Sequence, residues 1–211
     1  MSTERIDLSS LKHNQDLLDE DLGNVIKAFE KTLVIPKEKP SIQFTLCPIG
    51  LIHSGKTTVV RELSKRLNLI LISSDNLRDI LNSRGYNSKR MVEIIDRIVR
   101  KYLSLGYSTA ADADCVSAKD VLLKREKEFG IKLVWIHINP PESFIINNLK
   151  TYEKKWLFKN YDEVLSAYQE RKKLHTDLSA FKFVYVFDPS KNNFDSQIEE
   201  SIKTINRTLN A

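Results

Sequence analysis

The sequence has little cysteine, glycine or proline and no long apolar run. Its 211 residues include six glycines, six prolines and only two cysteines, Cys47 and Cys115. Two cysteines cannot form a disulfide framework, and their spacing does not match that of a zinc site. No apolar run approaches the ~20 residues of a membrane span, and the polar, acidic amino terminus lacks the pattern of a secretory signal. We therefore expect a cytoplasmic protein with no membrane association.

The remaining composition is sufficient for a sizeable folded core. Hydrophobic residues make up 41% of the chain and charged residues 29%, which is typical of a globular protein and not of a disordered one. Given a usual domain size of about 150 residues, the length favours one domain with an added segment over two large domains.

Positive charge is concentrated in the body of the chain. Residues 1–40 contain six Lys or Arg and eight Asp or Glu, whereas the rest of the chain contains 27 basic and 20 acidic side chains. An excess of this sign attracts phosphates and nucleic acids over long distances without identifying a binding site. Charge alone therefore leaves RNA or DNA as an open possibility for the partner.

An amphipathic helix is predicted from about Leu11 to about Leu33, followed by a linker that contains Pro36 and Pro40. Its apolar residues recur at three- and four-residue steps: Leu18, Leu22, Val25, Ile26 and Phe29. We expect residues 1–40 to be an N-terminal helical extension of a domain spanning residues 41–211. The apolar stripe is expected to pack on that domain, with docking of a partner protein as the alternative.

From Ser41 onward, short β-branched or aromatic segments alternate with helical patterns. The predicted strands are residues 42–47, 69–73, 108–111, 131–138 and 181–187. Strands separated by helices predict an α/β fold of three layers, in which helices cover both faces of a five-stranded parallel sheet. Right-handed crossovers would place all the carboxyl ends at one edge, where ligands bind in such sheets.

The segment after the first predicted strand has the spacing of a P-loop: Gly50, four residues, then Gly55, Lys56 and Thr57. Glycines allow the backbone to approach phosphates, and N–H groups at the start of the following helix provide fixed positive dipoles. We expect Lys56 to contact the β- and γ-phosphates of ATP and the Thr57 hydroxyl to bind Mg²⁺. The predicted nucleotide-binding residues are Gly50, Ser54, Gly55, Lys56, Thr57 and Thr58.

A second group of candidate residues follows the next predicted strand. Asp75 and Arg78 would lie at the same sheet edge as the P-loop, one helical turn apart. The Asp75 carboxylate can accept the proton of an attacking hydroxyl, and the Arg78 guanidinium can pair with a phosphate. The alternative is structural, with Ser74 or Asp75 capping the helix and Arg78 pairing with it.

These residues resemble those of the compact P-loop kinases grouped around polynucleotide 5′-hydroxyl kinase, zeta-type toxins and chloramphenicol phosphotransferase. The resemblance covers residues 42 to about 190. In that group the strand after the P-loop ends in an Asp with an Arg three residues later, matched here by Asp75 and Arg78. It implies that Asp75 is the general base, that Arg78 contacts the acceptor or the phosphate, and that Lys56 offsets charge during catalysis.

A third strand in the family ends in Asp, often as Asp-x-Asn, and this chain has Asp112, Ala113 and Asp114 there. Asp112 matches the family and is a candidate Mg²⁺ ligand, through a water molecule. Asp114 replaces the amide and adds negative charge beside the site. Period-two spacing predicts both carboxylates on one strand face, with solvated strand-end acids as the alternative.

Two further segments depart from the family pattern. Many members have Pro and Gly where this loop has Ile52 and His53. The family also has a lid with arginines that close over the triphosphate, expected here at about residues 150–172. This segment carries Arg171 only near its end, and its other cations are lysines: Lys150, Lys154, Lys155 and Lys159. Lysine lacks the planar fork of arginine, so a solvated basic helix face is the alternative. The resemblance places residues 187–191 beside the adenine.

The leading interpretation is a kinase that transfers the γ-phosphoryl group of ATP to a hydroxyl acceptor. A 5′-hydroxyl of RNA or DNA comes first and a small molecule second, because the body is basic yet contains no recognisable nucleic-acid module. Two further interpretations are a nucleoside monophosphate kinase and a nucleotide-dependent regulatory ATPase.

Overall fold

The computed structural model describes residues 15–151 and 160–211. Its centre is one parallel sheet with the strand order β2-β3-β1-β4-β5. The strands are β1 (Phe44–Ile49), β2 (Ile70–Ser73), β3 (Thr109–Asp112), β4 (Lys132–Ile138) and β5 (Phe183–Phe187). The predicted α/β fold with a five-stranded parallel sheet is therefore confirmed.

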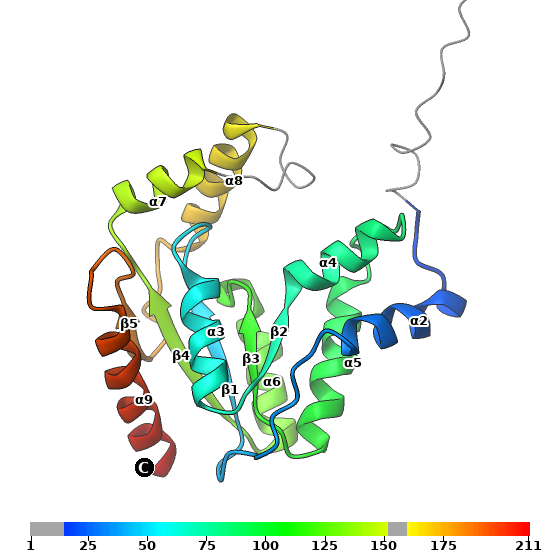
Figure 1. The fold of residues 1–211 in the computed structure, drawn as a ribbon, viewed down its shortest axis with the longest axis horizontal. Coiled ribbons are helices and arrows are strands. Elements are labelled where there is room, and N and C mark those ends of the chain that lie inside the picture. The colour runs from blue at the N-terminus through cyan, green and yellow to red at the C-terminus, as the bar shows by residue number, and fades with distance from the viewer. Residues whose placement is uncertain (1–14, 152–159) are drawn as a thin grey trace, which may run out of the picture.

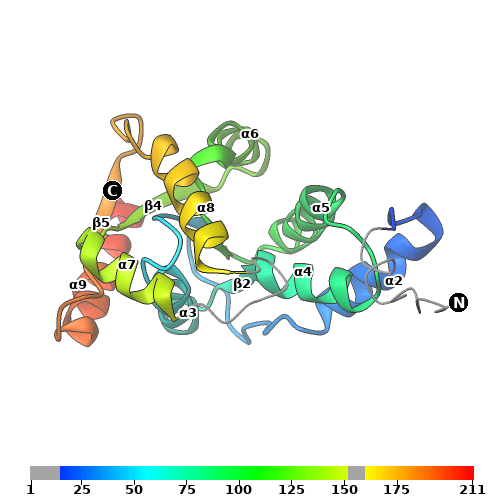
Figure 2. The ribbon, with the colours of Figure 1, turned by 90° about the horizontal axis from the view of Figure 1, so that it is seen from above.

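Helices cover both faces of this sheet (Figure 1). They are α2 (Asp19–Glu30), α3 (Lys56–Arg66), α4 (Ser74–Ser83), α5 (Met91–Ser104), α6 (Lys119–Phe129), α7 (Glu142–Lys150), α8 (Tyr161–Leu174) and α9 (Phe194–Asn210), with a short 3₁₀ turn η1 (Val116–Ala118). Seen from above, α3 and α9 lie on one side of the strands and α5 and α6 on the other (Figure 2). Within the described ranges, none of these helices combines the length and apolarity needed to cross a membrane.

The central strand β1 contributes side chains to the core on both faces. Phe44 and Leu46 are buried in the cluster formed with α3 and α9. Cys47 and Ile49 are buried in a second cluster that includes Leu122 of α6. Successive residues of a strand point to opposite faces, so a strand covered on both sides is apolar throughout. The loop after β1 is consequently held at the end of a fully buried strand.

The boundaries of β1 differ from the prediction. The strand was expected over residues 42–47, whereas it spans Phe44–Ile49 and includes Pro48. Proline has no N–H for a ladder hydrogen bond, which argues against a central strand position. Here the pairing of β1 with β3 ends at Leu46, and the Pro48 carbonyl accepts a hydrogen bond from the Cys115 N–H at 2.9 Å. The strand therefore ends two residues later than expected, directly before Gly50 of the predicted P-loop.

The N-terminal helix α2 is shorter than the predicted helix from Leu11 to Leu33. Residues 11–14 lie outside the described residues, and Gln15 forms an isolated parallel bridge with Tyr86. The helix ends after Glu30, where the Thr32 hydroxyl donates to the Phe29 carbonyl at 2.7 Å. Local side-chain bonding of this kind competes with helix continuation.

The apolar side of α2 packs on the rest of the chain. Leu22, Val25 and Phe29 are buried in the same cluster as Leu77 and Leu81 of α4. The expectation that the stripe packs on its own domain is therefore met for these three side chains. Since α4 carries Asp75 in its first turn, the extension supports one of the candidate catalytic residues.

The burial of Phe29 makes α2 a determinant of stability. Phe29 is fully buried, whereas Leu18, at the N-cap of the same helix, is 56% exposed. We expect Phe29→Ala to lower the free energy of unfolding by about 3–5 kcal/mol, because it removes a buried ring and leaves a cavity. Leu18→Ala, the matched control, should change it by less than about 0.5 kcal/mol. Urea denaturation measures both, and equal effects would contradict the packing of α2.

Candidate active site

The loop between β1 and α3 leaves no room for side chains at its two glycines. A Cβ atom on Gly50 would lie 2.7 Å from the Ile138 carbonyl oxygen of β4. Gly55 has a φ of 95° at the start of α3, and a Cβ there would lie 3.0 Å from Pro189 after β5. A side chain at either position would displace neighbouring segments. The loop therefore has the close-packed glycine backbone that phosphate binding requires.

Lys56 is folded onto this loop. Its Nζ donates hydrogen bonds to the carbonyls of Gly50 and Leu51, both at 2.7 Å. Burial lowers the pKa of the ammonium group, and the charges of Asp114 and Asp112 act in the opposite direction. Nearby, the Ser54 hydroxyl is buried and has no hydrogen-bond partner among the described residues. A buried donor of this kind points to a polar ligand in the loop.

Thr57 and Asp112, the two predicted Mg²⁺ ligands, are brought into contact. The Thr57 hydroxyl of α3 donates to the Asp112 Oδ1 at the end of β3, at 2.8 Å. Hydroxyl and carboxylate oxygens are the ligands that Mg²⁺ prefers. Across residues 15–151 and 160–211, no group of three or more His, Cys, Asp or Glu side chains is arranged to hold a metal ion. A magnesium ion between Thr57 and Asp112 would therefore take its remaining ligands from phosphates and water.

Period-two spacing predicted that Asp112 and Asp114 share one strand face. This prediction is wrong. The strand β3 ends at Asp112, so the alternation of side chains does not extend to Asp114. Its Oδ1 accepts from the Gly50 N–H at 3.3 Å, and its Oδ2 lies 3.0 Å from the Nε2 of His175. Burial opposes ionisation of Asp114, but the hydrogen bond to His175 and the charges of His175 and Lys56 lower its pKa below the usual value.

Asp75 and Arg78 lie at the same edge as the P-loop and pair with each other. Arg78 Nη1 donates to Asp75 Oδ1 at 2.7 Å. Ser73, rather than Ser74 or Asp75, caps α4 by accepting from the Asn76 N–H. Ser73 also pairs in register with Asp112 of β3. The pairing of Arg78 with Asp75, which the structural alternative predicted, is thus present. Both residues also lie at the sheet edge where the catalytic hypothesis requires them.

The helices α7 and α8 pack directly on the P-loop. Four buried residues join the two helices: Ile145, Leu149, Val164 and Tyr168. Leu51 and Ile52 of the loop pack against this cluster. Asn148 of α7 also donates to the His53 carbonyl at 3.2 Å. His53 has a φ of 59°, a conformation that histidine adopts more readily than most residues. The bulky residues of this loop therefore anchor α7 and α8.

Only part of the predicted lid is described. Lys154, Lys155 and Lys159 lie outside the described residues. Lys150 is exposed at the end of α7. Arg171 lies in the last turn of α8, one turn before His175, which contacts Asp114.

No sequence motif predicts two of the contacts around the loop. His175 and Asp114 are 61 residues apart, and Asn148 and His53 are 95 residues apart. Neither pair has a spacing that local periodicity could connect, so only the tertiary fold shows them.

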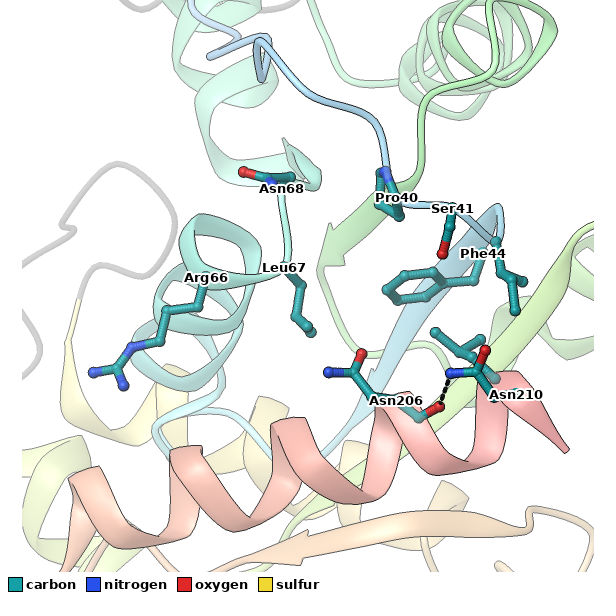
Figure 3. Close-up of a pocket in the computed structure, with 10 residues that line it drawn as sticks. Pro40, Ser41, Phe44, Arg66, Leu67, Asn68, Asn206 and Asn210 are labelled. Carbon is teal, nitrogen blue, oxygen red and sulfur yellow. Dashed lines mark hydrogen bonds between the residues drawn. The ribbon is translucent and has the colours of Figure 1, made fainter.

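A pocket of about 220 Å³ lies away from the P-loop (Figure 3). It is lined by Phe44 at the start of β1, by Arg66 at the end of α3, and by Asn210 at the end of α9. The P-loop follows the other end of β1, so this pocket lies at the amino ends of the strands. Arg66 is already paired with Glu62 and Glu199.

The glycine contacts generate a direct test of the loop. We expect Gly50→Ala to weaken binding of a non-hydrolysable ATP analogue by more than about tenfold, because the new Cβ displaces the loop from β4. Gly23→Ala in α2 is the matched control, since a Cβ there has nothing within 4 Å. Titration calorimetry with magnesium present measures both variants, and thermal melting checks that they fold. Unchanged affinity in Gly50→Ala would show that the loop does not hold phosphates.

Comparison with known proteins identifies the fold. A family model described as an AAA domain matches residues 46–175, and no curated protein sequence matches the chain. A structure from the PezAT chromosomal toxin–antitoxin system of Streptococcus pneumoniae is 14% identical with a TM-score of 0.59, covering 93% of this chain and 100% of that chain.

Two kinases with similar structures have comparable scores. The Mycobacterium tuberculosis APS kinase in complex with AMPPNP and APS is 15% identical with a TM-score of 0.52, covering 79% of this chain and 99% of that chain. Shikimate kinase from Bacteroides thetaiotaomicron is 14% identical with a TM-score of 0.52, covering 81% and 99% respectively. The chain thus has the fold of P-loop kinases.

Proposed function

The chain belongs to the AAA domain family, and from this membership we propose that it is an ATP-dependent kinase acting on a hydroxyl of a small acceptor. One observation carries the proposal. The hydrogen bond from Thr57 to Asp112, and the register of Ser73 with Asp112, hold the P-loop and the start of α4 at one sheet edge. Phosphoryl transfer needs a triphosphate site and an acceptor base in such proximity.

The triphosphate would lie along the loop from Gly50 to Thr58. Backbone N–H groups at the start of α3 would bind the phosphates. A phosphate oxygen would also accept a hydrogen bond from the buried Ser54 hydroxyl. The Lys56 ammonium exchanges the carbonyls of Gly50 and Leu51 for phosphate oxygens. Thr57 and Asp112 would hold Mg²⁺, which when bound neutralises charge on the phosphates.

Asp75 is the proposed general base and Arg78 its partner in positioning. A carboxylate at hydrogen-bond distance from an acceptor hydroxyl removes its proton as the new O–P bond forms. Arg78 fixes Asp75 through the 2.7 Å hydrogen bond and has further donors for the acceptor or the transferring phosphate. Lys56 offsets the charge that develops on the transferring group.

A small acceptor is favoured over a polynucleotide 5′-hydroxyl. The two kinases with similar folds are named for shikimate and for APS, and no structure named above is a polynucleotide kinase. The polynucleotide 5′-hydroxyl remains the second candidate, because residues 41–211 hold the excess of basic side chains. A regulatory ATPase is less favoured, since the stripe proposed to dock its partner has Leu22, Val25 and Phe29 buried.

A reducing compartment, the cytoplasm, is the proposed location. Both Cys47 and Cys115 are free and buried in the hydrophobic core. Free cysteines persist where thiols are kept reduced.

Substitution of Asp75 tests the chemistry separately from nucleotide binding. We expect Asp75→Asn to lower phosphoryl transfer by about a hundredfold or more, because the amide cannot take the proton. Affinity for an ATP analogue should change by less than about threefold, since the P-loop is intact. Glu20→Gln, the same acid-to-amide change at an exposed position of α2, is the control. Transfer of labelled γ-phosphate to a panel of hydroxyl compounds measures the activity, and full turnover in Asp75→Asn would exclude the role.

Salt dependence separates the two acceptor classes. Turnover of a small acceptor should change little between ~50 and ~200 mM salt. Binding of a single-stranded oligonucleotide that contacts about six phosphates should weaken roughly 300-fold over that range, because counterions are released. Fluorescence anisotropy with a labelled oligonucleotide makes the measurement. A steep salt slope together with phosphorylation of the 5′ end would reverse the order of the two candidates.

A further inference from the structure

One carboxylate connects the end of α8 to the phosphate loop. His175 is the C-cap of α8, and its Nε2 lies 3.0 Å from Asp114 Oδ2. The other oxygen of Asp114 accepts from the Gly50 N–H at 3.3 Å. The side chains of His175 and Asp114 are 7% and 14% exposed. This contact is therefore shielded from water and directional, unlike the exposed ion pairs elsewhere on α8.

The chemistry of Asp114 explains why both contacts form at once. An ionised carboxylate only accepts hydrogen bonds, so His175 must carry its proton on Nε2. The two oxygens of Asp114 can then serve Gly50 and His175 simultaneously. The negative charge that Asp114 adds to the site is also offset by the nearby Lys56 ammonium, whose charge helps to lower the pKa of Asp114.

The position of Arg171 depends on the same helix end. Residues four apart in a helix lie on the same face, so Arg171 and His175 share one side of the last turn of α8. The same face carries Val164 and Tyr168, whose cluster packs against Leu51 and Ile52 of the phosphate loop. Arg171 therefore lies between two residues of the α8 face that meets the loop. The His175 contact thus holds a guanidinium where a triphosphate would need it.

The beginning and middle of α8 are fixed independently. Val164 and Tyr168 are buried with α7, and the Tyr168 hydroxyl donates to Glu142 at 2.9 Å. These contacts hold the beginning and middle of the helix, which leaves His175 to fix its end against the loop. Loss of the His175 contact should therefore move Arg171 without unfolding the helix pair.

We propose that His175, through Asp114, is a positioning residue that sets α8 and its Arg171 over the phosphate loop for nucleotide binding. This inference rests on the proposed function, because it assumes that a triphosphate occupies the loop. His175 itself does not touch the substrate. His175 affects nucleotide binding only through the position of Arg171, so substitutions of the two residues should not have additive effects.

A double-mutant cycle between His175 and Arg171 provides the test. We expect His175→Ala and Arg171→Ala each to weaken binding of a magnesium–ATP analogue by about tenfold, and the double variant to bind about as weakly as either single one. His175→Gln should recover most of the affinity, because its side-chain amide can donate to Asp114. Lys173→Ala, on the same turn and paired only with Glu170 in the described part of the chain, is the control and should bind like the wild type.

A second measurement does not depend on nucleotide. Amide hydrogen exchange across residues 168–175 of the nucleotide-free protein should accelerate in His175→Ala and remain unchanged in Lys173→Ala. Thermal melting accompanies each variant, and a folded His175→Gln keeps the test valid if the alanine variant does not fold.

The outcomes separate this inference from the proposed function. Additive losses in the double-mutant cycle, or wild-type affinity and exchange in His175→Ala, would overturn the positioning role while leaving a kinase active. If His175 and Arg171 are coupled as expected but the protein transfers phosphate to no hydroxyl acceptor, the positioning role is supported and the kinase proposal is overturned. Failure of the wild type to bind any nucleotide would overturn both.

Discussion

Close contact between Gly50 and β4 fixes the backbone on which the site is built. The space for a side chain is taken by the Ile138 carbonyl and the Ser54 hydroxyl. The polar groups of Gly50 are both engaged, its N–H with Asp114 and its carbonyl with Lys56. Segments that follow β1, β3 and β4 thus converge on a single residue. A buried backbone with all its hydrogen bonds made has little freedom, so the loop is organised before any ligand arrives.

Charges of both signs surround this loop in a defined order. Lys56 lies on the loop itself, and α8, which carries Arg171, lies above the loop in the view of Figure 1. The acids Asp112 and Asp75 lie at the ends of the neighbouring strands β3 and β2. In the proposed kinase, a triphosphate would lie beside the cations and Asp112 would help to hold its magnesium ion, while Asp75 on the α4 side would take the proton of the acceptor. The anion site and the proton acceptor would then occupy different parts of the same sheet edge.

The sequence predicted the strands and the P-loop of this site better than it predicted the side-chain contacts between them. Hydrophobic patterning gave the five strands to within about two residues, because the strands are short, largely apolar segments between helices, and the central strand β1 is buried throughout. The P-loop spacing was informative because its chemistry is local. Asp114 was placed wrongly, because the period-two pattern was extended beyond Asp112, where β3 ends. His175 had no signal at all, since its partner lies far away along the chain and only the path of α8 brings them together.

Packing of Leu51 and Ile52 against α7 and α8 has a kinetic consequence. Withdrawal of these helices would expose two aliphatic side chains, at a cost of roughly 1.5–3 kcal/mol for each that is fully uncovered. We therefore expect α7 and α8 to stay in place over the loop while a ligand binds. If a nucleotide occupies the loop, Leu51 and Ile52 would slow its release past these helices, although neither residue takes part in the proposed chemistry.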